Sequence, residues 1–231
     1  MIAETVTDAP VPVWTHVAEL RRRLIRVLAA LGACCAAVYP RTGRVVEWLA
    51  RPLGQLTFRR PLEAFDTRLL LAFYLGAFAV FPFFAGEAWA FAAPAVSPSA
   101  RRLLARVLPA AYVLFALGAA LALLVILPPA TAFFLSFGGA SLRPLISVEE
   151  YVAFAARLAL AFGLAFQTPL VMLALRRLGL ATRDGLAARR RQVYFAAFVL
   201  GAVLTSPEVL TQVSLALPLI ALYELGLLLC R

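Results

Sequence analysis

The sequence predicts an all-α integral membrane protein with six transmembrane helices and both termini on the cytoplasmic side. Three observations support this prediction: 63% of the 231 residues are hydrophobic, six apolar segments follow one another, and the charged residues gather between these segments. Soluble domains average about 45–50% apolar residues. A single soluble core cannot bury this excess of apolar residues, so a lipid bilayer is the expected solvent. An unusually apolar soluble helical bundle is the alternative.

Residues 1–231 are expected to form a single membrane domain, because no internal repeat or long linker divides the chain. A helix needs roughly 20 apolar residues to cross the hydrocarbon core of a bilayer. The expected spans are 24–39, 69–93, 103–130, 151–175, 193–205 and 209–229. Cytoplasmic segments are expected at 1–23, 94–102 and 176–192, and outer loops at 40–68 and 131–150.

The first outer loop is expected to contain a short helix. Apolar residues recur there at helical spacing around Trp48, with Arg44, Glu47 and Arg51 between them. This pattern is typical of an amphipathic helix that lies in the membrane interface.

The fifth and sixth helices are expected to be short. At a rise of about 1.5 Å per residue, segment 193–205 reaches about 20 Å, whereas the hydrocarbon core is about 30 Å thick. This pair of helices then either thins the bilayer locally or is held short by its neighbours. The alternative is that the fifth helix extends into Arg191-Gln192 and Ser206.

Prolines recur inside the apolar runs, among them Pro82, Pro109, Pro169 and Pro218. Each removes one backbone hydrogen bond and is expected to kink its helix. Lipid cannot satisfy the freed carbonyl, so a neighbouring helix or water must do so. Four such bends predict a cupped arrangement rather than a straight bundle.

The arginines set the expected orientation. The 22 basic residues are all Arg, and with the N-terminus inside, 14 fall in cytoplasmic segments, 7 in outer loops and Arg157 within the fourth span. An arginine excess on the cytoplasmic side is the positive-inside pattern of multi-pass proteins. Because the arginines cluster between apolar runs, we expect no nucleic-acid binding despite the net charge of +10.

Enzyme chemistry and cofactor binding are not expected. The only histidine is His16, and the sequence has no HExxH, GxSxG or P-loop motif and no nucleophile–base pair at membrane depth. Cys34, Cys35 and Cys230 lack the spacing of metal ligands. We therefore expect no catalytic residue, no metal and no cofactor.

Polar side chains within the apolar runs are few, and charges there are costly. They are Glu87, Arg157, Gln167, Gln212 and Glu224. Arg157 and Glu224 lie near helix ends, where their side chains can extend to the interface.

The segment before the first span places Glu19 and Arg23 four residues apart. On a helix, this pair lies on one face and stabilises the helix slightly. From chemistry alone, the simplest interpretation is a solvated helix beside the membrane with positive-inside arginines.

Six motifs, in order along the chain, resemble those of the TatC family. HVAELRRRL at 16–24 is similar to H-[aliphatic]-x-E-L-R-x-R-L, PLEAF at 61–65 to P-x-E-A-F, and WAFAAPA at 89–95 to W-x-F-[aliphatic]-x-P-[small]. FGLAFQTP at 162–169 is similar to F-G-x-x-F-[E/Q]-x-P, LTSPE at 204–208 with Gln212 to L-T-P-P-D-x-x-x-Q, and LYELG at 222–226 to the family's final helix. Together they extend the resemblance over residues 14–231.

The resemblance implies the core receptor and scaffold subunit of the twin-arginine translocase, a multi-pass protein of the bacterial or archaeal cytoplasmic membrane. Such a subunit binds twin-arginine signal peptides and exports folded proteins, driven by the proton-motive force. The implied partners are single-span TatA- and TatB-type proteins, membrane lipid and further copies of the chain. The implied signal-binding residues are Glu19, Leu20, Arg21, Arg23, Pro94 and Val96.

One departure from the family pattern concerns the cytoplasmic loop 94–102. Family members carry Glu before the paired arginines of this loop, whereas this sequence has Ala100 before Arg101-Arg102. We hypothesise that Glu87 supplies the missing carboxylate, because carboxylates bind guanidinium groups through charge-assisted, often bidentate, hydrogen bonds. A helix-packing or interface-reaching role for Glu87 is the alternative.

Gln167, Thr205 and Gln212 match positions at which the resemblance implies docking of the partner helices. An amide can hydrogen-bond a neighbouring helix in lipid; packing within the chain is the alternative for Gln167, and local capping for the other two. A small-solute or ion transporter subunit remains the competing function. Such a transporter requires paired charges or broken helices near the middle of the membrane. In this sequence, only Gln167 and Arg157 approach that requirement.

Overall fold

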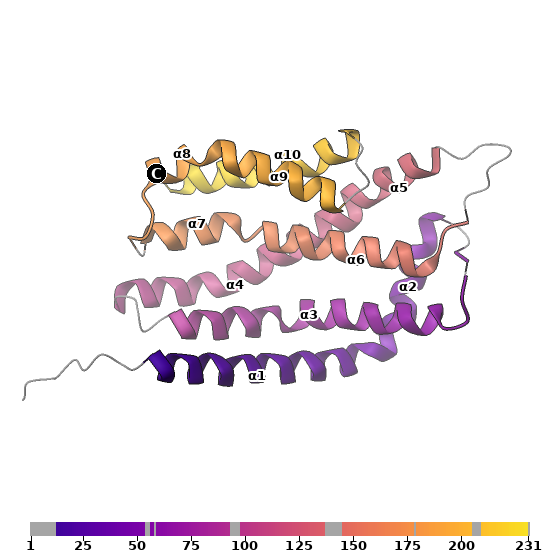
Figure 1. Ribbon diagram of the computed structural model, residues 1–231, viewed down its shortest axis with the longest axis horizontal. Coiled ribbons are helices and arrows are strands. Elements are labelled where there is room, and N and C mark those ends of the chain that lie inside the picture. The colour runs from indigo at the N-terminus through magenta and orange to yellow at the C-terminus, as the bar shows by residue number, and fades with distance from the viewer. Residues whose placement is uncertain are drawn as a thin grey trace, which may run out of the picture.

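The computed structural model consists of helices that lie side by side (Figure 1). It describes residues 13–53, 56–57, 59–92, 98–136, 145–177, 179–204 and 209–230. Within these ranges, the only strand-like feature is an isolated bridge between Thr57 and Ser147. The prediction of an all-helical fold is therefore confirmed.

The helices, in chain order, are α1 Val13–Val38, α2 Thr42–Ala50, α3 Glu63–Ala92, α4 Pro98–Leu121, α5 Leu127–Ser136, α6 Val148–Ala165, α7 Thr168–Arg177, α8 Arg183–Ala188, α9 Arg190–Leu204 and α10 Val209–Leu229. A π-helical turn, Ala122–Ile126, joins α4 to α5. Short 3₁₀ turns, Tyr39–Arg41 and Arg51–Leu53, flank α2.

Four helical stretches of the described chain are long and apolar enough to cross a membrane. They are His16–Ala50, Glu63–Phe91, Leu108–Ser136 and Val148–Arg177. The remaining helices are shorter: α9 has 15 residues, and the apolar part of α10 is Leu215–Leu229. The prediction of several apolar, span-length helices is thus confirmed for the first four.

The helices form an array with α1 at one edge and the α9–α10 hairpin at the other (Figure 1). Contacts run from α1 to α3, from α3 to α4 and α6, from α4 to α6, and from α10 to α7 and α9. The start of α1 and the end of α10 lie at the same end of the array, and α2 lies at the opposite end (Figure 1). In this view, the α9–α10 hairpin stops short of the level of α2.

The core lies where α4 crosses α6. Phe115 and Phe162 are fully buried there, and Phe81 of α3 stacks on Phe115 with ring centroids 3.9 Å apart. Two glycines allow the approach: a Cβ on Gly118 would lie 2.6 Å from the Phe162 carbonyl oxygen, and one on Gly163 would lie 2.7 Å from the Phe115 ring. The close packing of these two helices therefore depends on the absence of side chains at two positions.

Gly118→Ala is expected to destabilise the fold by about 1–3 kcal/mol, the usual range for an overpacked core. The obstructing atom is a backbone carbonyl oxygen, so the two helices must separate. The measurement is the thermal unfolding midpoint in detergent. Gly32→Ala is the matched control, because a Cβ there meets nothing within 4 Å and alanine favours a helix. Equal midpoints for the two variants would contradict the prediction.

Several helix boundaries differ from those expected. The first helix begins at Val13 rather than at 24, so the charged segment before the first span continues that helix. The helix expected to begin at 69 begins at Glu63, whose carboxylate accepts hydrogen bonds from the preceding backbone. Charged residues at a helix end escape a prediction that relies on apolar runs alone.

The expected outer loop 131–150 is helical up to Ser136 and again from Val148. Pro128 and Pro129 directly follow the π-helical turn and lie inside the continuous helical stretch Leu108–Ser136. The expected cytoplasmic loop 176–192 contains α8, capped by the Thr182 hydroxyl. Because α9 begins at Arg190, the alternative that the fifth helix extends into Arg191-Gln192 is correct at that end.

Candidate functional site

An ion-pair cluster joins the first turns of α1 to the last turns of α3. Glu19, Arg23 and Arg26 lie at positions i, i+4 and i+7 of α1 and so share one helix face. Glu87 of α3 faces them. The four side chains come from segments more than 60 residues apart in sequence.

Arg23 is the centre of this cluster. Its Nε donates to Glu19 Oε1 at 3.0 Å, and its Nη2 pairs with the same oxygen. Its Nη1 donates to Glu87 Oε2 at 2.9 Å, and Nη2 reaches the Ala90 carbonyl oxygen at 3.3 Å. Arg26 Nη1 lies 2.9 Å from Glu87 Oε1. One guanidinium group thus bridges two carboxylates from two helices.

The cluster is partly sheltered but remains accessible. The side chains of Arg23 and Glu87 are 16% and 11% exposed, whereas Glu19 is 25% exposed. Both hydrogen bonds of Glu19 go to Oε1, so Oε2 has no hydrogen-bond partner among the described residues. A carboxylate has about four acceptor sites, and Glu19 therefore keeps capacity for a further donor.

The two carboxylates and two guanidinium groups balance in charge. An incoming guanidinium group can bind the free side of Glu19 or take the place of Arg23 or Arg26. The arrangement is therefore suited to exchanging one guanidinium partner for another, in a partly desolvated setting where such bonds are stronger than in water.

The structure brings together Glu19, Arg23 and Glu87 of the predicted binding residues. Leu20 and Arg21 are exposed on α1 and do not join the ion pairs. Pro94 and Val96 lie outside the described residues, as does the side chain of Ala100. Sequence reasoning missed Arg26, although its spacing from Arg23 places both on one helix face.

The residues predicted to dock partner helices have contacts within the chain. Gln167 Nε2 donates to the carbonyl oxygens of Ala111 at 3.0 Å and Gly163 at 3.3 Å, which ties the α6–α7 junction to α4. Gln212 Nε2 donates to the Phe198 carbonyl oxygen at 3.0 Å and so links α10 to α9. Thr205 lies outside the described residues.

The four prolines that were predicted to kink helices all lie in helices of the structure. Pro82, Pro109 and Pro218 are inside α3, α4 and α10. Pro169 lies in the first turn of α7, directly after the break at Phe166-Gln167 that separates α6 from α7. Pro169 has no N–H to bond the carbonyl of Ala165, four residues earlier, which fits a break at this point.

A second ion pair links α9 to α10. Arg190 donates to both Glu224 oxygens at 2.8 Å, and the Tyr194 hydroxyl donates to Glu224 Oε1 at 2.5 Å. Glu224 thus has a specific partner instead of simply reaching for the interface.

The opposite end of the molecule has its own polar centre, which sequence reasoning did not identify. Glu63 is only 1% exposed. Its Oε2 accepts from the backbone N–H groups of Arg59 at 2.5 Å and Arg60 at 3.1 Å, and its Oε1 accepts from the Ser147 hydroxyl at 2.5 Å. The bridge between Thr57 and Ser147 lies beside it. Glu63 therefore joins the start of α3 to the start of α6.

Among the described residues, no group of three or more His, Cys, Asp or Glu side chains is arranged to hold a metal ion.

Comparisons with known proteins identify the family. A sequence model described as Sec-independent protein translocase protein (TatC) matches residues 15–218. The TatC of Carboxydothermus hydrogenoformans is 30% identical over 229 residues, covering 97% of this chain and 94% of that protein. The TatC of Aquifex aeolicus is 32% identical over 226 residues, covering 94% of both chains.

Comparison with solved structures indicates the same family. Two crystal structures described as the twin-arginine translocase receptor TatC superpose with TM-scores of 0.82 and 0.85, each at 32% sequence identity. The first covers 93% of this chain and 97% of the solved chain, and the second covers 94% and 99%. The chain therefore belongs to the TatC family of Sec-independent protein translocases.

Proposed function

We propose that this translocase subunit is the receptor and scaffold to which twin-arginine signal peptides bind, and that it exports folded proteins across the cytoplasmic membrane. The observation that carries the proposal is the pair of carboxylates, Glu19 and Glu87, that converge on Arg23. A site that already binds guanidinium groups is suited to the two that a twin-arginine motif presents. The subunit itself is proposed to have no catalytic activity.

The proposed topology has six transmembrane helices with both termini in the cytoplasm of a bacterial or archaeal cell. The arginine excess supports this orientation, as does the location of both described ends on one side of the array (Figure 1). In this topology, α9 and α10 are the short fifth and sixth spans, and Pro82, Pro109, Pro169 and Pro218 kink their helices into a cupped arrangement.

The proposed partners are single-span TatA- and TatB-type proteins, which dock near Gln167, Thr205 and Gln212, and further copies of this chain. The amide carbonyl oxygens of Gln167 and Gln212, and the second N–H of Gln212, lie beyond the contacts given above. Such groups can accept a partner helix without breaking the hydrogen bonds inside the chain. The proposed energy source is the proton-motive force.

Direct binding tests the receptor proposal. The purified chain, with a photocrosslinking residue at position 20, is incubated with a twin-arginine signal peptide or its Lys-Lys variant. We expect crosslinking to the arginine peptide and at least about tenfold less to the lysine peptide, because lysine lacks the bidentate donor geometry. The control carries the crosslinker at Leu145, which is exposed at the opposite end. Equal labelling by both peptides, or at both positions, would reject the proposal.

A further inference from the structure

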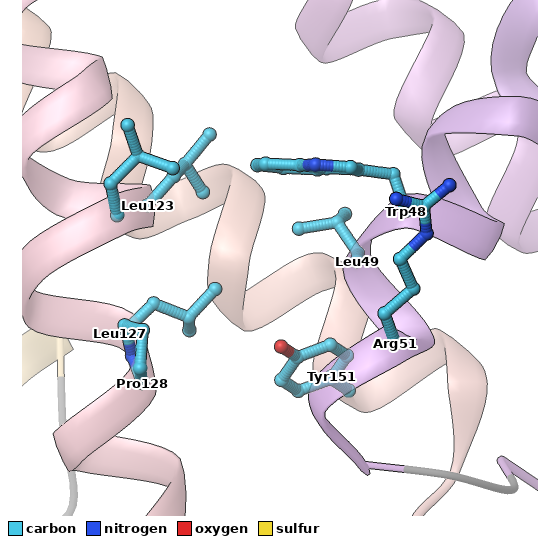
Figure 2. Close-up of a pocket in the computed structure, with 8 residues that line it drawn as sticks. Trp48, Leu49, Arg51, Leu123, Leu127, Pro128 and Tyr151 are labelled. Carbon is cyan, nitrogen blue, oxygen red and sulfur yellow. The ribbon is translucent and has the colours of Figure 1, made fainter.

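A cavity lies between α2 and the junction of α4 with α5, far from the ion-pair cluster (Figures 1 and 2). Its volume is about 200 Å³, and it is open to the outside. It is lined by Trp48, Leu49, Arg51, Leu123, Leu124, Leu127, Pro128 and Tyr151. The lining is mostly apolar, with one cation and one hydroxyl group.

The hydroxyl group of Tyr151 is the first indication of a ligand. Tyr151 is only 6% exposed, and Figure 2 shows its hydroxyl group directed into the cavity. This hydroxyl forms no hydrogen bond with any residue that the structure describes. Buried tyrosine hydroxyls normally have a partner. The cavity therefore contains a hydrogen-bond donor that has no acceptor within the described chain.

Arg51 supplies a positive charge at the mouth. Its side chain is exposed and makes no ion pair or hydrogen bond within the described chain. Trp48, one turn earlier, extends its ring across the cavity towards the α4–α5 junction (Figure 2). Tryptophan and arginine at the membrane interface lie at the level of lipid headgroups. An anionic group at this mouth would find a free cation.

The wall opposite α2 is shaped by the π-helical turn Ala122–Ile126. Both Leu123 and Leu124 line the cavity, and Leu124 is 61% exposed. The wall thus continues from the cavity to the outside of the array. π-Helical turns of this kind often mark functional positions. Together with Leu127, these side chains form a continuous apolar path that suits a hydrocarbon chain.

We propose that this cavity binds one anionic glycerophospholipid from the leaflet in which α2 lies. Arg51 binds the phosphate, the Tyr151 hydroxyl donates to an ester carbonyl, and one acyl chain lies along Leu123, Leu124 and Leu127. Under the topology proposed above, this is the outer leaflet. The lipid site rests on the cavity alone and is independent of signal-peptide binding.

A phospholipid fits better than a transmembrane helix of a partner protein. A transmembrane helix carries few charged side chains, so it offers Arg51 an anion less readily than a lipid does. A lipid provides free ester carbonyls and an anionic head on the same molecule. Its occupancy would brace α2 against the π-helical turn.

Native mass spectrometry of the full chain, delipidated in detergent and titrated with dioleoylphosphatidylglycerol, tests the proposal. We expect one lipid per chain at saturation. Arg51→Gln and Tyr151→Phe should each weaken the binding, the first by about tenfold and more than the second, because a hydrogen bond to a charged group contributes most. Leu124→Trp, which adds bulk at an exposed position, should block the acyl chain.

Arg44→Gln is the matched control, because Arg44 is an exposed arginine on α2, two turns before Arg51, but not in the cavity lining. It should bind lipid as the unmodified chain does. Unfolding midpoints without added lipid show whether each variant is folded. If the Leu124→Trp variant does not fold, the Arg51→Gln and Tyr151→Phe variants alone test the proposal. Equal binding by all variants would overturn the proposal. So would a photocrosslinker at position 124 that captures a partner's single helix instead of lipid in native membranes.

Discussion

Glu87→Gln is expected to lower export of a twin-arginine reporter protein by at least about tenfold. Glu87 holds Arg23 and Arg26 at 2.9 Å each, and as a neutral amide it would lose its charge-assisted bonds to any guanidinium group, a loss of about 10–100-fold in affinity. The measurement is the fraction of reporter found outside the cytoplasm, with equal membrane levels of the variant.

Arg26→Gln is the decisive companion, because it breaks the Arg26–Glu87 ion pair and keeps the carboxylate. If Glu87 binds the signal peptide, this variant should export normally, since Glu87 Oε1 becomes free for the incoming group. If Arg26→Gln fails as badly as Glu87→Gln, the carboxylate only holds helices together. If Glu87→Gln exports normally while Glu19→Gln abolishes export, Glu87 is not the second carboxylate.

Glu63→Gln is expected to lower the thermal unfolding midpoint by about 5–10 °C, a large effect for a chain of this size. Both Glu63 oxygens accept hydrogen bonds, Oε2 from two backbone N–H groups and Oε1 from the Ser147 hydroxyl. An isosteric amide must turn its NH₂ group towards one of these sets of donors. One buried group then loses its partner, which is costly.

The matched control is Glu150→Gln at the same end of the molecule. Glu150 pairs with Arg59 at 3.1 Å, but both side chains are exposed, and exposed ion pairs contribute little to stability. Its midpoint should change by no more than about 1–2 °C. Similar shifts for the two variants would mean that the buried hydrogen bonds of Glu63 do not hold α3 to α6.

Composition and apolar runs were sufficient to predict an all-helical membrane fold, because a bilayer restricts a chain to few solutions. The boundaries were less accurate, since α1 and α3 extend into charged residues that an apolar window excludes. The short α8 was missed altogether. Its cap at Thr182 was visible in the sequence, but its six residues fall below the length at which periodicity can be recognised.

The candidate site was predictable in part. Glu19 and Arg23 share a helix turn, so their pairing follows from spacing alone. Glu87 attracted attention as a costly charge in an apolar run and as a candidate for the missing carboxylate, but its partners lie 61 to 64 residues away. The Glu63–Ser147 contact spans 84 residues. No local pattern reports a contact of that kind, because it depends on how whole helices pack.

The bridging position of Arg23 has a consequence for selectivity. Any peptide that binds Glu19 and Glu87 competes with the Arg23 guanidinium group, which is tethered to the same helix as Glu19 and whose effective concentration is of order millimolar or higher. A peptide with one basic residue replaces one ion pair of Arg23 with an equivalent ion pair, so it gains little binding free energy. A peptide with two adjacent forked donors can satisfy both carboxylates at once. Under the proposed function, this competition sets an affinity threshold that rejects abundant protein segments with a single basic residue.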